Sequence, residues 1–176
     1  TVNNGTAPVT ATVIVTPTFD NGGVNCAGIA DTFYITVNPT ATVNAINNQT
    51  VCNGAAVAAV TPTTTATGGT VTYAWTNDNA SIGLSASGTG TIPAFTAINT
   101  GTAPVTATIT VTPTFTNNGL SCEGTVRTYT ITVNPTATVN AVSNQVVCNG
   151  SASAAVNFST TATGGTVTYA WTNSNT

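Results

Sequence analysis

The sequence predicts an all-β protein built from tandem β-sandwich domains, with about seven strands in each repeat. Three observations favour this fold class. The chain repeats itself at a fixed spacing, apolar residues alternate with threonine along several segments, and turn-forming residues separate these segments. No segment shows the roughly 3.6-residue period of an amphipathic helix, so we expect essentially no helix.

Two motifs define the repeat. Asn-Pro-Thr-Ala-Thr-Val-Asn begins at Asn38 and again at Asn134, a displacement of 134 − 38 = 96 positions. Gly-Gly-Thr-Val-Thr-Tyr-Ala-Trp-Thr begins at Gly68 and again at Gly164, with the same displacement. A period of this length is that of an ordinary sandwich domain.

The alignment of the two copies sets the domain boundaries. Residues 1–80 align with residues 97–176 without a gap. The predicted domains are the C-terminal part of one repeat, one complete repeat and the N-terminal part of the next, at residues 1–40, 41–136 and 137–176. We therefore interpret the chain as part of a longer polypeptide. The proline at each boundary restricts the backbone and suits a short, stiff link between domains.

Period-two alternation places the strands of the complete repeat. It is strongest at residues 105–115, where valine, isoleucine and phenylalanine share one face and threonine occupies the other. Residues 128–133 supply an antiparallel partner across the Asn-Asn-Gly turn at residues 117–119, and residues 70–76 supply a third strand. Weaker strands are expected in four segments: residues 41–45, 55–60, 81–84 and 91–97. This spacing is typical of an immunoglobulin-like sandwich.

The same alternation predicts the core. Trp75 falls on the inward side of its strand together with Tyr73, and Phe115 falls on the inward side of the strongest strand. An exposed tryptophan could instead be a platform for sugar binding. Because its neighbours on the same face are apolar or aromatic, we favour the core assignment for all three aromatic residues.

The four cysteines are expected to be structural. A chain without histidine offers little for zinc or nucleophilic catalysis at Cys26, Cys52, Cys122 and Cys148. Our leading pairing is Cys52 with Cys122, which would close a loop of roughly 70 residues and stabilise the repeat by about 4 kcal/mol. A bridge between neighbouring repeats and free thiols are the two alternatives. Under the leading pairing, Cys26 and Cys148 would pair outside these residues, and any bridge implies an oxidising, extracellular compartment.

Composition excludes several classes of function. The chain is 41% hydrophobic and 3% charged, with a single cation, Arg127, and a formal net charge of −3. One cation cannot supply the several phosphate contacts that nucleic-acid binding needs, and no apolar run reaches the roughly 20 residues of a membrane helix. No base is present to activate the many hydroxyl groups, and no acidic position recurs in both copies. We expect no enzyme, cofactor or metal site.

The outward-facing threonines have three interpretations. The simplest is that β-branched residues fit a pleated sheet. The second is glycosylation, with Thr32 as the leading O-linked candidate and Asn48 and Asn79 as N-linked candidates in Asn-x-Ser/Thr sequons. The third is a flat threonine array that binds ice, which the usual twist of sandwich sheets disfavours.

Four motifs together resemble the PKD-like, immunoglobulin-like tandem repeats of giant surface proteins from Bacteroidetes-type bacteria. They are Val-Cys-Asn-Gly at Val51, Gly-Thr-Val-Thr-Tyr-Ala-Trp-Thr at Gly69, Gly-Thr-Gly-Thr-Ile-Pro-Ala-Phe at Gly88 and Ile-Thr-Val-Asn-Pro at Ile131. The resemblance covers the whole chain. It implies an exported adhesin or gliding-type filament at the cell surface, with no catalytic residues to assign.

These observations together lead to one expected function and one competitor. We expect a structural repeat of an extracellular filament or stalk, whose partners are neighbouring repeats stacked end to end or copies of the same protein, with glycans as further partners. The competing interpretation is an adhesin domain that binds a glycan or a host cell through its loops.

Overall fold

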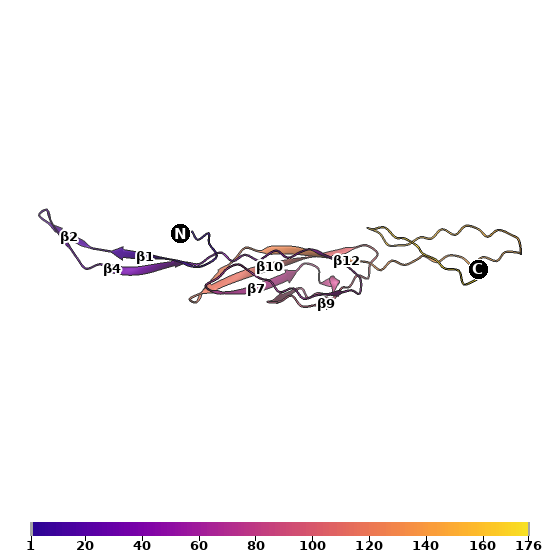
Figure 1. The fold of residues 1–176 in the computed structure, drawn as a ribbon, viewed down its shortest axis with the longest axis horizontal. Coiled ribbons are helices and arrows are strands. Elements are labelled where there is room, and N and C mark those ends of the chain that lie inside the picture. The colour runs from indigo at the N-terminus through magenta and orange to yellow at the C-terminus, as the bar shows by residue number, and fades with distance from the viewer. Residues whose placement is uncertain (1, 176) are drawn as a thin grey trace.

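The computed structural model describes residues 2–175. Figure 1 shows an elongated molecule with three parts in line: an N-terminal hairpin, a central domain and a C-terminal extended segment. The structure is all-β, and its only helical element among the described residues is a short 3₁₀ turn, η1 (Ala80–Ile82).

The central domain is built on one main sheet. Its strand order is β5-β12-β10-β7-β8, and β11 pairs with the far end of β10. The strands are antiparallel except for β5 and β12, which run parallel. Their bounds are β5 Gln49–Cys52, β7 Thr70–Asn77, β8 Ser87–Thr89, β10 Val105–Asn117, β11 Leu120–Glu123 and β12 Arg127–Asn134.

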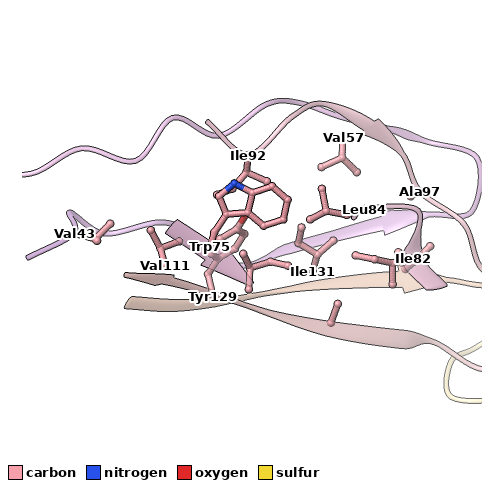
Figure 2. Close-up of a cluster of buried hydrophobic side chains, with 13 residues drawn as sticks. Val43, Val57, Trp75, Ile82, Leu84, Ile92, Ala97, Val111, Tyr129 and Ile131 are labelled. Atoms are coloured by element: carbon pink, nitrogen blue, oxygen red, sulfur yellow. The ribbon is translucent and has the colours of Figure 1, made fainter. Parts of the chain in front are cut away.

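A second, smaller layer covers one face of this sheet. It contains the two-stranded sheet of β6 (Ala56–Val57) and β9 (Phe95–Thr96), and a bridge between Val60 and Ile92 extends it. Figure 2 shows Trp75 and other main-sheet side chains meeting those of the covering layer. This two-layer arrangement is consistent with a β-sandwich.

The strongest strand predictions are confirmed. Residues 105–115, 128–133 and 70–76 lie within β10, β12 and β7, and β10 pairs with both of the others. The inward positions of β10 are buried, whereas its threonines lie on the other, more exposed face. The alternating pattern therefore sets which face of the sheet carries the core.

The weaker predictions are less accurate. Residues 81–84 are not a strand, because Asn79 caps η1 through its side chain and Gly83 ends the turn with a positive φ of 99°. Residues 41–45 form only an isolated bridge at Thr42. The short strands β5, β8 and β11 were not predicted. Because two of the seven expected strands are absent and these three are added, β5 to β12 amount to one strand more than expected.

The N-terminal hairpin repeats the β10–β12 part of the central domain. Its β1 pairs with β4 in the register that β10 and β12 use, 96 positions later, and β2 pairs with β3 as β10 does with β11. The bounds are β1 Val9–Val15, β2 Thr18–Asn21, β3 Val24–Ala27 and β4 Asp31–Val37. Nothing among the described residues covers the apolar face of this hairpin.

Residues 137–175 correspond to residues 41–79 but contain no strand. Copies of β10 and β12 do not lie beside this segment, so its extended stretches lack strand partners. Its turns nevertheless keep their shape. Ser151 N donates to Cys148 O at 3.0 Å, as Ala55 N does to Cys52 O at 3.1 Å.

Candidate inter-repeat interface

The same loop contact joins the N-terminal hairpin to the central domain and the central domain to the C-terminal segment. We call these two places the first and the second junction. At the first junction, Thr67 N donates to Thr6 O at 2.7 Å. At the second, 96 positions later, Thr163 N donates to Thr102 O at 2.8 Å. Both bonds link one repeat to the next, so the junction recurs with the period of the sequence.

Glycine is required beside this bond for two reasons. Gly68 and Gly164 both have positive φ values, 75° and 74°, which side chains rarely tolerate. A Cβ on Gly68 would also lie 2.7 Å from Pro8 Cδ, and one on Gly164 would lie 2.7 Å from Pro104 Cδ. The recurring proline and glycine therefore let the two loops approach closely.

An asparagine side chain holds each junction loop in place. Asn99 is 4% exposed, and its side-chain amide donates to Ala103 O at 2.8 Å and to Val133 O at 2.7 Å. Asn3 makes the same bonds in the N-terminal hairpin, to Ala7 O and to Val37 O, both at 2.8 Å. Each asparagine ties the loop that contacts the next repeat to the end of the last strand.

The tip of the β10–β11 hairpin completes the first junction. Its turn has positive φ at Asn118 (49°) and Gly119 (77°), and the Asn117 side chain donates to Asn38 Oδ1 at 2.9 Å. Asn38 lies just after β4, at the boundary between repeats. A cavity of about 310 Å³ lies at the second junction, beside Pro104, Pro135 and Gly164, whereas the cavity beside Asn38 and Asn117 at the first junction is about 130 Å³.

The structure does not form the expected bridge between Cys52 and Cys122. All four cysteines have free thiols. Cys52 lies opposite Asn134, at the end of β12, whereas Cys122 lies opposite Phe115, near the other end of β10. The main sheet separates them by its length, roughly 30 to 40 Å at 3.3 Å per residue, far beyond the reach of a disulfide.

Trp75 and Phe115 are buried in the central domain, and Tyr73 packs partly buried against the same core. Burial raises the pKa of Tyr73 and of Tyr129 above the ordinary value of 10.0. The Trp75 Nε1 and Tyr129 hydroxyl groups are buried without a hydrogen-bond partner. A buried polar group without a partner lowers the stability of the core, and burial keeps both groups away from the surface.

The candidate glycosylation residues differ in their surroundings. Thr32 is exposed, and the hydrogen bond at this residue is made by its backbone N–H, which donates to Asp31 Oδ1 at 2.9 Å. Asn48 is exposed but accepts a bond from Thr130 N at 2.9 Å. Asn79 is half-buried and caps η1. Thr32 is therefore the most accessible of the three.

No catalytic constellation was predicted, and the described residues contain no group of three or more His, Cys, Asp or Glu side chains placed to hold a metal. No helix within residues 2–175 has the length and apolar character needed to cross a membrane.

Sequence reasoning missed the junction residues, although one signal was present. Ala-Pro-Val-Thr recurs at Ala7 and Ala103, at the same period as Gly68 and Gly164. Neither a protein-family model nor a curated protein matches the sequence. Function is therefore inferred from the repeat and from the contacts at the junctions.

Proposed function

We propose that this chain is a non-catalytic structural repeat of an extracellular bacterial surface filament or stalk, made of immunoglobulin-like, PKD-like domains stacked end to end. The recurring junction is the observation that carries this proposal. Two loop bonds of 2.7 and 2.8 Å and two glycine–proline contacts occur 96 positions apart. A contact that repeats with the sequence can propagate along any number of repeats.

The surface supports the same role. With 3% charged residues and a net charge of −3, the chain has little charge to keep copies apart in solution. Only one cation is available to bind an anionic ligand. Both features suit a component whose main contacts are with its own neighbours.

A series of proteins with one, two and four complete repeats tests this function by small-angle X-ray scattering. The maximum dimension should grow by about 40 Å for each repeat, the length of a strand as long as β10. In the longer proteins, alanine at every Gly68-equivalent position should shorten the average dimension. Alanine at the Gly54-equivalent positions is the matched control, since Gly54 also has positive φ but contacts nothing across a junction. Dimensions that do not grow with repeat number would reject the filament.

The adhesin alternative makes a different prediction. The loops at one end of each domain, including Gly68, are occupied by the preceding repeat. Recognition would then depend on a terminal domain or on the sides of the stack. A glycan array and a cell-binding assay on the repeat series distinguish the two, because an inert stalk binds neither.

One observation keeps the ice-binding alternative testable. Strand pairing places Thr110 opposite Thr76 and Thr128, so threonines from three neighbouring strands share a row on the outer face. An ice-binding protein would lower the freezing point of its solution below the melting point, whereas a filament component would not.

A further inference from the structure

The first and last segments of the central domain run side by side in the same direction. Residues 41–53 lead from the first junction toward the second, and β12 runs the same way. The structure joins them at two places. Ala41 and Thr42 meet Thr125 near the first junction, and β5 pairs with β12 near the second. The chain therefore enters the domain on one member of this pair and leaves it on the other.

Both ends of the pair are fixed to the opposite segment. Where the chain enters, Thr125 N donates to Ala41 O at 2.8 Å. Where it leaves, Asn53 N donates to Asn134 O at 2.9 Å, and the Asn53 side chain donates to Thr136 Oγ1 at 3.1 Å. Neither segment can therefore be pulled along its own direction without loading these bonds.

Asparagine side chains add bonds between the two ends. Asn48 Oδ1 accepts from Thr130 N at 2.9 Å, directly before β5 begins. Asn99 contacts both segments, because its N–H donates to Asn53 Oδ1 at 2.8 Å and its side chain donates to Val133 O at 2.7 Å. These bonds add to the four residue pairs that join β5 to β12. The two segments are thus connected along most of the length of β12.

The side chains that make these bonds recur with the repeat. Four of them have identical equivalents 96 positions away, namely Asn48 at Asn144, Asn53 at Asn149, Asn99 at Asn3 and Thr136 at Thr40. No charged residue has an identical equivalent in the other copy. The residues needed for this pairing are therefore a regular feature of the repeat.

The direction of pull decides how such a pair fails. Tension along the molecule draws Ala41 toward the N-terminal hairpin and Thr136 toward the C-terminal segment, which lie at opposite ends of the central domain (Figure 1). The two segments would then slide past each other. Because the bonds of a parallel pair are evenly spaced along it, they carry this load together. A pair separated from one end instead breaks one bond at a time, at a lower force.

We propose that the central domain is a load-bearing unit, in which the pairing of residues 41–53 with residues 125–136 resists tension along the molecule. We call this pairing the clamp. Forced unfolding depends on the unfolding rate and not on equilibrium stability, so a few bonds placed across the load outweigh many placed elsewhere. The proposal rests on the filament function and adds to it the ability to transmit force.

Pulling the same domain in two directions by optical tweezers tests this proposal. In the sliding attachment, the 176-residue chain carries Thr40→Cys and Ala137→Cys, which lie just outside the two ends of the clamp. In the peeling attachment, it carries the native Cys52 and Ala137→Cys, which lie at the same end of the clamp. All other cysteines are replaced with serine in both chains, and force is applied through the two remaining thiols.

The mean unfolding force should be at least about twice as high in the sliding attachment as in the peeling attachment, because the bonds share the load in the first and break in turn in the second. Sliding should release about 300 Å of chain in one event, the extended length of one 96-residue repeat less that of the folded domain. Urea unfolding should give both chains the same free energy, which assigns the difference in force to the direction of pull.

Two asparagine variants locate the resistance in the clamp. Asn48→Ala removes the acceptor of Thr130 N, a bond across the clamp. Asn44→Ala is the matched control, since Asn44 is also exposed and its side chain donates to Thr63 Oγ1 at 2.9 Å, outside the clamp. In the sliding attachment, Asn48→Ala should lower the mean unfolding force and Asn44→Ala should leave it unchanged.

Two results would overturn the proposal. These are equal forces in the two attachments, or an Asn48→Ala variant that unfolds at the same force as Asn44→Ala. If the scattering series still grew by about 40 Å per repeat, the filament would stand as a passive spacer and only its load-bearing role would be rejected. A resistant domain in a series that did not grow would reject the filament instead.

Discussion

Tyr129 shows how one side chain limits the stability of the central domain. It is 2% exposed, and its hydroxyl has no hydrogen-bond partner. A buried, unpaired hydroxyl costs about 1 to 3 kcal/mol relative to its hydrated state. The equivalent position in the first repeat holds Phe33, so the repeat tolerates a ring without the hydroxyl.

Replacing Tyr129 with phenylalanine should raise the free energy of unfolding by about 1 kcal/mol. It should also reduce the loss of stability at alkaline pH. Burial raises the pKa of Tyr129, so below about pH 10 both states keep the proton and stability is full. Above that pH, the unfolded chain releases the proton first and stability falls.

Urea unfolding between pH 7 and pH 11 measures both effects. Some alkaline loss should remain in the variant, because burial also raises the pKa of Tyr73. Tyr34→Phe is the control, since Tyr34 is 69% exposed. An equal alkaline loss in wild type and Tyr129→Phe would contradict this account.

At the scale of elements, strands with strong alternation could be predicted accurately, whereas short elements without such a pattern could not. β10 has 13 residues with alternating burial, so its extent and its inward face follow from the pattern. β5 has four residues and joins the sheet through a parallel pairing with β12, which no local pattern indicates. η1 depends on the Asn79 cap and on Gly83, signals that the apolar residues at 82 and 84 obscured.

The cysteine pairing failed for a similar reason. The spacing of cysteines does not determine which of them meet, because connectivity depends on topology. Only the pairing of Cys52 with β12 and of Cys122 with β10 reveals that they lie at opposite ends of the sheet.

Replacing both Cys52 and Cys122 with serine should change the free energy of unfolding of the central domain by less than about 1 kcal/mol, because both thiols lie outside the buried core. The comparison is made by chemical unfolding without reductant, with wild type in reductant as the control. A loss near 4 kcal/mol, the contribution of a bridge across a loop of this length, would show that the two cysteines pair.

At the scale of the whole molecule, the repeat was readable from the sequence but the interface between repeats was not. Thr6 and Thr67 are far apart along the chain, and neither is unusual for a loop. Their contact depends on the loop that Asn3 anchors and on the positive φ of Gly68. What the sequence did offer was the shared period of Pro8, Gly68 and their copies.

The distance between two positions one period apart tests the stacked arrangement most directly. Thr10 and Thr106 are exposed equivalents on β1 and β10. Each is changed to cysteine and spin-labelled in a chain whose native cysteines are serine, and the labelled protein is diluted with unlabelled copies. Double electron–electron resonance should then give one narrow distance near 40 Å, the length of one domain. A broad distribution, or a distance well below that value, would mean that the repeats are not held end to end and would contradict the filament.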